Sequence, residues 1–378
     1  MERSTDVVRT CVYIDVTRLA DMAQAQTGIA RIGRELSEQL DSDNRFDVVR
    51  LIRPKFLRFN EVEKAICDPG HQLFGYRDQL VIASEDSHGG EVFPSVRMSS
   101  SDLYLSTHLP LPDRHLTGDA KRAVIVHDLI HHEQFGREPA VEQPSMISKV
   151  LESTDVKRDF VVVPSATTLQ DLVSLNGWER ANTLLLPWGT HFHEQEPAQA
   201  RQGVFAVLQA SPRKNSKVAL EAIVAALGEA YLSQHMLRVV ATGSMVEYSQ
   251  NYLSASPLGD DRWSVRSGVT DRELMQLLGE TAVFLYPSSF EGFGLPMIEA
   301  FACGAPVVAV IGSASVEVGG PAVCYAASPS LHDLRSAVSL VLSDVDYQQH
   351  LSSAGRNRAQ SFTWQSAAHQ LADALLSL

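Results

Sequence analysis

Cysteine is scarce in this chain of 378 residues, which contains only Cys11, Cys67, Cys303 and Cys324 and no Cys-x-x-Cys pair. This scarcity argues against a zinc site or a thiol redox motif and suits a reducing cytoplasm. Positive charge is also in short supply. The formal net charge is −13, and both halves of the chain share the acidic excess, so we expect no nucleic-acid partner.

Long hydrophobic runs are absent as well. The start, MERSTDVVRT, lacks the apolar core of a secretory signal, and no stretch approaches the ~20 apolar residues that span a bilayer. We therefore expect a cytoplasmic protein that at most touches the inner face of the membrane. The segment 45–59, RFDVVRLIRPKFLRF, could make such a peripheral membrane contact. The alternative is a strand at 46–52 and a solvated loop with snorkelling Arg and Lys side chains.

What the chain does contain is an alternation of short apolar runs with longer segments of helical periodicity. Most runs are continuous and rich in Val, Leu and Ile, which is typical of parallel strands buried on both faces. The sequence therefore predicts an α/β fold. The predicted helices include 216–231, 271–280, 295–303 and 330–343. The predicted strands lie at 12–16, 46–52, 79–84, 102–106, 123–128, 159–165, 183–187, 204–210, 237–242, 282–288, 305–310 and 322–326.

The length of the chain predicts two domains rather than one. The boundary is expected in the polar, proline-containing segment 191–203. This gives an N-terminal domain at 1–195, a C-terminal domain at 196–360 and a final helical segment at 361–378. Ligands of parallel sheets bind beyond the carboxyl ends of the strands, so site residues are sought directly after each strand.

The most informative segment, YPSSFEGFGLPMIEAFACGAPVVAV (286–310), runs from a strand end through a helix into the next strand. Gly292 and Gly294 permit a sharp bend and a close approach of the backbone to a ligand. Free N–H groups at the helix start favour an anionic or hydroxyl-rich ligand. Glu291 and Glu299 can accept hydrogen bonds from sugar diols. The structural alternative is a tight turn in which Glu299 complements the helix dipole.

The pair Glu291 and Glu299, with seven residues between them, resembles the E-x7-E signature of retaining GT-B glycosyltransferases, and EGFGLPMIEAFACGAPVVA is similar to a long stretch of glycosyltransferase family 4. The resemblance implies two Rossmann-like domains whose parallel sheets face each other across a cleft, with the C-terminal helix crossing back to the N-domain. It also implies that Glu291 contacts the donor hexose and Glu299 the nucleotide ribose. The donor-binding stretch between them would include Gly292, Phe293, Gly294 and Leu295.

A second segment, SPRKNSK (211–217), follows the first strand of the C-terminal half. Arg213 and Lys214 could neutralise a diphosphate leaving group, which is electrostatic catalysis. The alternative is a solvated basic turn in which Asn215 or Ser216 caps the next helix. The segment resembles the RKN motif with which family 4 binds the donor diphosphate, although this chain reads VLQAS where the family usually has a glycine after the strand.

In the N-terminal half, IVHDLIHHEQF (125–135) follows a strand. His127 or Asp128 could bond a sugar or an acceptor, or they could be a structural histidine and a capping aspartate. The pair looks like the His-Asp of family 4, whose His lies against the donor sugar. A metal site would draw in His131, His132 and Glu133, but no helix for an HExxH-type pair is evident. The resemblance implies no metal and no cofactor.

The segment 15–36 places Thr-Gly-Ile between the first strand and the first helix. Gly28 could let backbone N–H groups approach a phosphate of the donor, with Arg31 as a weaker candidate. The alternative is an ordinary loop with Thr27 as the N-cap. The segment resembles the N-terminal loop of bacterial polysaccharide enzymes of family 4.

Taken together, the resemblance implies a retaining glycosyltransferase of bacterial surface polysaccharide synthesis, such as that of O-antigen. It would move a hexose of the mannose, rhamnose or glucose type from a nucleotide-diphosphate sugar to a glycan or lipid-linked acceptor. In that family the leaving phosphate itself takes the acceptor proton. The alternatives are an epimerase or phosphorylase of the same fold, and a non-catalytic donor-binding subunit of a polysaccharide machine.

Overall fold

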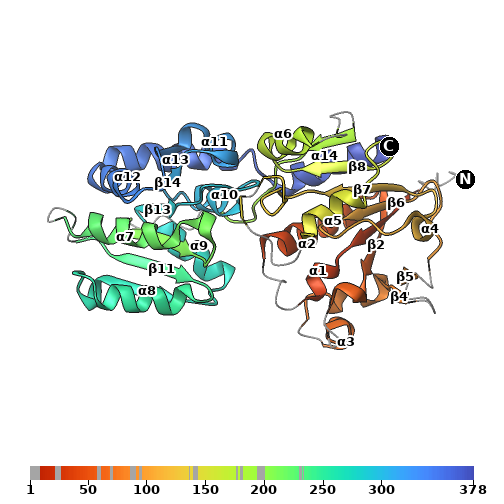
Figure 1. Cartoon of the computed structure of the whole chain (residues 1–378), viewed down its shortest axis with the longest axis horizontal. Coiled ribbons are helices and arrows are strands. Elements are labelled where there is room, and N and C mark those ends of the chain that lie inside the picture. The colour runs from red at the N-terminus through yellow and green to blue at the C-terminus, as the bar shows by residue number, and fades with distance from the viewer. Residues whose placement is uncertain are drawn as a thin grey trace, which may run out of the picture. The chain divides into compact units, whose positions relative to one another are not determined.

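The computed structural model describes residues 9–21, 27–57, 61–68, 71–85, 91–92, 96–135, 137–138, 144–175, 178, 182–193, 201–229, 232 and 234–378. The chain forms two compact units. The first consists of Met1–Trp188 with Trp364–Leu378, and the second of Gly189–Thr363. In Figure 1 the first unit is coloured red to yellow, apart from its final blue helix, and the second green to blue.

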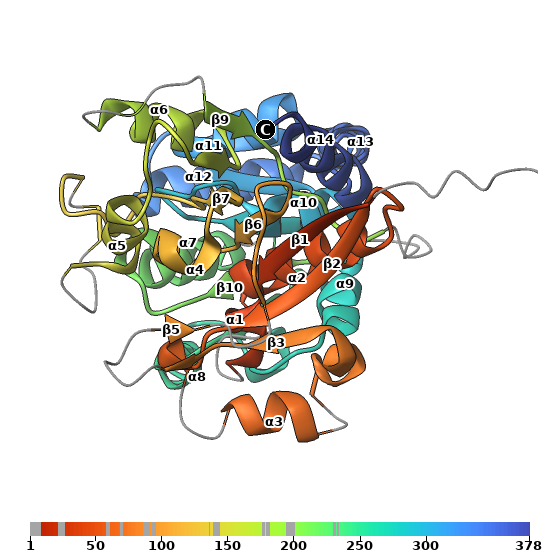
Figure 2. The ribbon, with the colours of Figure 1, turned by 90° about the vertical axis from the view of Figure 1, so that its right-hand side faces the viewer.

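A seven-stranded parallel sheet forms the centre of the first unit, in the order β3-β2-β1-β6-β7-β8-β9 (Figure 2). Its strands are β1 (Thr10–Asp15), β2 (Phe46–Ile52), β3 (Leu80–Ile82), β6 (Leu103–Ser106), β7 (Lys121–Ile125), β8 (Phe160–Val163) and β9 (Thr183–Leu185). A separate antiparallel pair consists of β4 (Ser84–Glu85) and β5 (Glu91–Val92). The helices are α1 (Thr17–Ala20), α2 (Gly28–Asp41), α3 (Glu61–Cys67), α4 (Arg114–Thr117), α5 (Met146–Glu152), α6 (Ala166–Ser174) and α14 (Trp364–Ser377).

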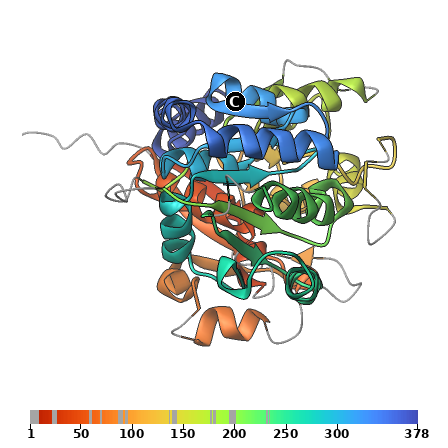
Figure 3. The ribbon, with the colours of Figure 1, turned by 90° about the vertical axis from the view of Figure 1, so that its left-hand side faces the viewer.

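The second unit contains a six-stranded parallel sheet in the order β12-β11-β10-β13-β14-β15. Its strands are β10 (Val204–Leu208), β11 (Leu237–Ala241), β12 (Trp263–Arg266), β13 (Val283–Tyr286), β14 (Val307–Val310) and β15 (Val323–Ala326). Its helices, which surround the sheet in Figure 3, are α7 (Ser216–Leu227), α8 (Met245–Ser254), α9 (Asp271–Glu280), α10 (Leu295–Ala302), α11 (Ser313–Gly319), α12 (Leu331–Ser343) and α13 (Val345–Ala359).

Both sheets reverse their strand order next to their first strand. In the first unit β1 lies between β2 and β6, and in the second β10 lies between β11 and β13. The loops that follow these central strands diverge to opposite faces of the sheet, which opens a crevice for a ligand at the carboxyl ends. The strand order therefore directs attention to the loops after β1 and β6, and to those after β10 and β13.

The C-terminal helix α14 returns to the first unit and packs against α2. Its first residue, Trp364, stacks on Trp188 with the ring centroids 6.4 Å apart. Farther along, Asp373 accepts a hydrogen bond from Arg45 at 2.7 Å. These contacts explain why the chain crosses between the units twice.

The parallel α/β architecture confirms the sequence prediction, and every predicted strand overlaps an observed one. Among the strands of the two parallel sheets, the apolar pattern does not predict β12, whose sequence Trp-Ser-Val-Arg forms an edge strand that is only partly buried. A short edge strand buries little apolar surface, so it lacks the continuous apolar run that revealed its neighbours.

Candidate active site

The turn after β10 brings Arg213 and Lys214 to the carboxyl end of the second sheet. Pro212–Lys214 form a single 3-10 turn, and Asn215 then adopts a left-handed conformation with φ of 49°. Asn215 is tolerated there better than most residues because its short polar side chain bonds locally. Its amide donates to the Pro287 carbonyl at 2.8 Å and to the Ser289 hydroxyl at 2.7 Å. Asn215 thereby ties the turn after β10 to the loop after β13.

This geometry rules out the alternative in which the side chain of Asn215 or Ser216 caps the next helix. Asn215 occupies the N-cap position of α7, but its side chain makes no capping bond because it reaches across to the neighbouring loop. The Ser216 hydroxyl instead bonds both main-chain groups of Gln209, at 3.0 Å to the N–H and 2.8 Å to the carbonyl. These two bonds close the loop without a glycine after β10.

The loop after β13 carries Glu291 and leads into α10. The Glu291 N–H donates to the Ser313 hydroxyl at 2.9 Å, and this hydroxyl donates back to the Glu291 carbonyl at 2.6 Å. Gly294 then adopts φ of 112° at the N-cap of α10, a conformation that favours glycine. The main chain at Glu291 is therefore fixed from both sides before the helix begins.

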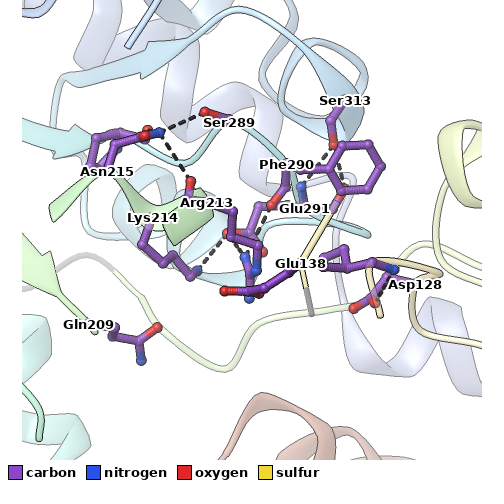
Figure 4. Close-up of polar contacts among 12 residues, drawn as sticks. Asp128, Glu138, Gln209, Arg213, Lys214, Asn215, Ser289, Phe290, Glu291 and Ser313 are labelled. Carbon is purple, nitrogen blue, oxygen red and sulfur yellow. Dashed lines mark hydrogen bonds and ion pairs between the residues drawn. The ribbon is translucent and has the colours of Figure 1, made fainter. Parts of the chain in front are cut away.

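The two cations and the first glutamate of the E-x7-E pair converge on one another (Figure 4). Arg213 Nη1 lies 2.8 Å and Lys214 Nζ 2.5 Å from the same oxygen, Glu291 Oε1. Their side chains are 19%, 15% and 13% exposed, respectively, so solvent reaches all three. The group is charged, largely buried and still reached by solvent, as a site for an anionic ligand requires.

The environment of Glu291 favours the ionised carboxylate. Burial raises its pKa, but the charges of Lys214 and Arg213 outweigh that effect, and the pKa lies below its ordinary value. Tyr286 and Ser288, both buried, lie against the same carboxylate. Burial and then the charge of Glu291 raise the pKa of Tyr286 well above its ordinary value, so this phenol stays neutral. Glu291 can thus accept hydrogen bonds but cannot readily donate a proton.

Glu299 is the fifth residue of α10 and is 5% exposed. The first turn of this helix has no acidic side chain, so Glu299 lies one residue beyond the turn where a carboxylate complements the helix dipole most strongly. Of the residues between the two glutamates, Phe293 is buried and packs edge-on against Phe362 at 5.7 Å. The predicted contacts of Gly292, Phe293, Gly294 and Leu295 with a donor stay predictions.

A pocket of about 420 Å³ lies beside the cationic turn. It is lined by residues that follow β10 and β11, including Gln209, Ser211 and Ser244. A wider hollow of about 520 Å³ is lined by helix residues such as Glu221, Tyr252 and Arg335. We consider only the first a candidate for the site, because it adjoins the strand ends where ligands of parallel sheets bind.

In the first unit, His127 follows β7 and is buried. Its Nε2 lies 2.7 Å from the Thr107 carbonyl, which can only accept, so Nε2 carries the proton. Nδ1 is buried and has no hydrogen-bond partner among the residues that the structure describes. Burial lowers the pKa of His127 to about 4, so the ring is neutral near pH 7. His127 therefore presents an unused acceptor at the end of its strand.

Asp128 does something different from its neighbour. Its Oδ1 accepts the N–H of Ile130 at 3.0 Å, which closes a turn after β7. No described helix begins at this turn, so the bond is not the helix cap that the sequence left open. Glu133 likewise accepts hydrogen bonds from Ser145 and Ser148 at the start of α5. Within the described ranges no three His, Cys, Asp or Glu side chains are grouped as metal ligands.

The N-terminal end of α2 contains Gly28, and Thr27 caps it by accepting the Ala30 N–H at 3.3 Å. This is the alternative weighed for the Thr-Gly-Ile segment. Arg31 lies in the first turn of the same helix and is partly buried. The structure does not test whether Gly28 or Arg31 meets a phosphate.

Sequence reasoning missed a buried network at the carboxyl ends of β1 and β2. Asp15 and Arg53 form an ion pair at 3.4 Å, with side chains 2% and 1% exposed. Asp15 also accepts hydrogen bonds from Thr17 and from the Tyr104 hydroxyl. The Thr107 hydroxyl donates to the Asp15 carbonyl at 2.8 Å, which links the network to the partner of His127. Charged residues directly after apolar strands were the available signal.

The same network corrects the interpretation of the segment 45–59. The strand at 46–52 is confirmed as β2, but Arg50 and Arg53 neither face a membrane nor snorkel into solvent. Arg50 is fully buried and pairs with Asp41 at 3.2 Å. Residues 58–60 lie outside the described residues. In the part of the chain that the structure describes, no helix combines the length and the apolar character needed to cross a membrane.

Comparison with known sequences supports a glycosyltransferase. The model of the family "Glycosyl transferases group 1" matches residues 190–358. The O-antigen chain mannosyltransferase B of Escherichia coli is 32% identical over 106 residues, and the MMP alpha-(1->4)-mannosyltransferase of Mycolicibacterium hassiacum is 37% identical over 108 residues. Each match covers 28% of this chain. The serotype-specific mannosyltransferase WbdA of E. coli is 24% identical over 68% of this chain.

The aligned regions span only 28%, 26% and 31% of these three relatives. Solved structures match over nearly the whole chain and define its fold. Anabaena Alr3699/HepE, in complex with UDP and glucose, has a TM-score of 0.70 at 14% identity and covers 98% of this chain and 100% of its own. The lipopolysaccharide glycosyltransferase WaaG has a TM-score of 0.66 at 14% identity, covering 96% and 98%. The chain thus has the GT-B fold.

Proposed function

We propose that the chain is a retaining hexosyltransferase that takes a hexose from a nucleotide-diphosphate sugar and adds it to a glycan or lipid-linked acceptor in surface polysaccharide synthesis. One observation carries this proposal: Arg213, Lys214 and Glu291 meet at the carboxyl ends of β10 and β13. A diphosphate needs cations, a hexose needs a hydrogen-bond acceptor, and a nucleotide sugar needs both within a few ångströms.

The two cations stabilise the leaving group during the reaction. Negative charge develops on the leaving nucleoside diphosphate as the sugar departs, and fixed positive groups in a partly dehydrated site stabilise that charge. Arg213 and Lys214 are already in place, because the Phe290 carbonyl accepts from Arg213 at 3.1 Å and the Tyr286 ring lies 5.7 Å from Lys214 Nζ. We propose that this charge replaces a divalent metal and that no cofactor takes part.

Glu291 binds rather than reacts. A carboxylate that two cations hold ionised is a weak nucleophile and a poor acid, but a good acceptor for hexose hydroxyls. This fits a front-face substitution with retention, in which the leaving phosphate takes the proton of the acceptor hydroxyl. Glu299, on the same helix, is proposed to bind the ribose, and His127 to accept a hydrogen bond from a sugar hydroxyl.

The sugar proposed first is mannose, because the three curated relatives are named as mannosyltransferases. A thermal-shift panel of GDP-mannose, UDP-glucose and dTDP-rhamnose tests the donor. A nucleotide sugar at ~100 times its Kd stabilises the folded protein by about 2.7 kcal/mol. If none of the three raises the unfolding temperature, the proposed donor class is wrong.

Transfer itself is tested with GDP-mannose and octyl α-mannoside as a synthetic acceptor. We expect free GDP only when the acceptor is present, an α-linked product by NMR, and the same rate in EDTA. Glu291→Ala should abolish transfer. Conversion of the donor without an acceptor would indicate an epimerase instead, and donor binding without any transfer would indicate a non-catalytic subunit.

A further inference from the structure

A single carboxylate oxygen lies between two cations in the candidate active site. Glu291 Oε1 accepts hydrogen bonds from both Arg213 and Lys214, at 2.8 and 2.5 Å. Under the proposed function these same cations must bind the diphosphate of the donor. The carboxylate therefore occupies N–H groups of Arg213 and Lys214 that the diphosphate needs. It also carries a charge of the same sign as the diphosphate.

We propose that Glu291 sets the discrimination between the nucleotide sugar and the nucleoside diphosphate product, a role that rests on the proposed function. The diphosphate of an intact donor is esterified at both ends, whereas the product has a free terminal phosphate and more negative charge. Both must compete with Glu291 for the cations. Only the intact donor compensates the carboxylate, because its hexose hydroxyls donate hydrogen bonds to it.

The product has no such hydroxyls next to the terminal phosphate. Once the hexose has left, Glu291 no longer accepts hydrogen bonds from its hydroxyls. The carboxylate then competes again with the phosphates for Arg213 and Lys214. The carboxylate thereby weakens the binding of the product selectively and favours its release. Without Glu291, the two cations would hold the more highly charged product more tightly than the donor.

A positioning role for Glu291 predicts the reverse result, since loss of the carboxylate would then release the cations. The contacts favour competition, because the cationic turn has other supports. The Arg213 carbonyl accepts from the Ser289 N–H at 2.9 Å and from the Asn215 amide at 3.1 Å. Arg213 Nη1 also donates to the Phe290 carbonyl. These bonds do not involve the Glu291 carboxylate, so the turn keeps its place when the carboxylate is neutralised.

The test is calorimetric titration of the full chain and of Glu291→Gln with two matched pairs, GDP with GDP-mannose and UDP with UDP-glucose. For the pair that binds, we expect the variant to bind the nucleoside diphosphate about tenfold more tightly, the size expected for removing one opposing charge at close range in a partly hydrated site. The nucleotide sugar should gain less or lose affinity, because the variant loses the acceptor for its hydroxyls.

Glu280→Gln is the matched control. Glu280 ends α9 and lies 3.7 Å from Arg238 at the start of β11, so this change removes the same charge at the opposite edge of the same sheet. Its effect on the four affinities should stay within about twofold, since exposed charges beyond a Debye length are screened. Glu291→Asp keeps the charge but withdraws it by one methylene, and it should give an intermediate ratio even if the glutamine variant unfolds.

The outcomes separate the two claims. If the wild type binds a nucleotide pair and Glu291→Gln binds the nucleoside diphosphate equally or more weakly, Glu291 positions the cations and the discrimination claim is wrong. If neither protein binds any of the four nucleotides, the proposed function is wrong, and this inference is wrong with it. A larger gain for the nucleotide sugar than for the diphosphate would also overturn the inference.

Discussion

The charged side chains at the carboxyl edges of the two sheets differ in burial and in net charge. At the edge of the first sheet, Asp15 and Arg53 pair below the surface with side chains 2% and 1% exposed. At the edge of the second, Arg213, Lys214 and Glu291 remain between 13% and 19% exposed and carry one net positive charge. Strand ends of the same kind of sheet thus serve structure in one unit and, as we propose, ligand binding in the other.

The difference teaches where a loss of charge should matter. A buried ion pair is costly to break, because the remaining partner is left without compensation in a poorly hydrated interior. A group that solvent still reaches keeps water as a substitute partner, so its loss costs less stability. We therefore expect substitutions at the first edge to act on folding and those at the second edge to act on catalysis.

The largest expected effect is that of Arg53→Met on folding. The variant leaves Asp15 buried without its ion-pair partner and should lose about 3–5 kcal/mol of unfolding free energy. Urea unfolding followed by tryptophan fluorescence measures this, because three of the four tryptophans, Trp178, Trp188 and Trp364, belong to the first unit. The double variant with Asp15→Asn should recover part of the loss. If Arg53→Met unfolded at the same urea concentration as the wild type, the Asp15–Arg53 ion pair would not stabilise the fold.

The next effect in size is that of Arg213→Ala on catalysis. Loss of one preorganised cation should lower kcat/KM for transfer from GDP-mannose about 10²–10³-fold. The unfolding free energy should change by about 1 kcal/mol or less, because Glu291 keeps Lys214 as its partner. Arg238→Ala, at the start of β11 in the same sheet, is the matched control and should keep full activity. Equal losses in the two variants would remove Arg213 from the site.

A third prediction concerns the effect of pH on the unfolding free energy, which should differ between His127 in the first unit and Glu291 in the second. The folded-state pKa of His127 is about 4, against 6.5 for the free side chain, so the unfolded chain binds a proton that the folded chain excludes. This contribution to stability is fully present above about pH 6.5 and is lost as the pH falls toward about 4. Between about pH 7 and about pH 5 the loss should reach about 2 kcal/mol. Glu291 has a lowered pKa and stays ionised over this range.

Urea unfolding of the wild type and of His127→Gln at both pH values measures this difference. In the variant, the unfolding free energy should depend less on pH, because the contribution of His127 is gone. A residual dependence of the unfolding free energy on pH is expected from the neighbouring His108, whose pKa is lowered mainly by burial. An unchanged slope in the variant would mean that His127 titrates normally in the folded protein.

The fold was predictable because its signals are local. Each buried parallel strand is a continuous apolar run, and the E-x7-E segment places a strand end, a turn and a helix within one stretch of sequence. The sequence also assigned Arg213 and Glu291 to one donor site after two such strands, β10 and β13, although it did not predict their ion pair. Of the described strands in the two parallel sheets, only β12 was not predicted, because this edge strand buries too little surface to leave an apolar run.

The network around Asp15 was not predictable in the same way. Asp15, Arg53, Tyr104 and Thr107 lie on segments far apart in the sequence, and each looks like an ordinary residue near a strand end. Their meeting depends on the strand order β2-β1-β6, which the apolar pattern does not specify. The basic residues of the segment 45–59 therefore suggested a solvated or membrane-facing segment, whereas tertiary packing buries Arg50 and Arg53.

The smallest expected effect concerns the residue that joins the two loops of the second edge. Asn215→Gly keeps the φ of 49° without strain but loses the amide bonds to Pro287 and Ser289, which should lower the unfolding free energy by about 1 kcal/mol. Asn215→Ala loses the same bonds and adds the steric cost of a left-handed residue, so it should lose about 1 kcal/mol more. Both variants should raise the KM for GDP-mannose by a similar factor, because the tie that holds the cationic turn is the amide and not the backbone angle. A higher KM in the alanine variant alone would show that the backbone conformation of Asn215, rather than its side chain, positions Arg213 and Lys214.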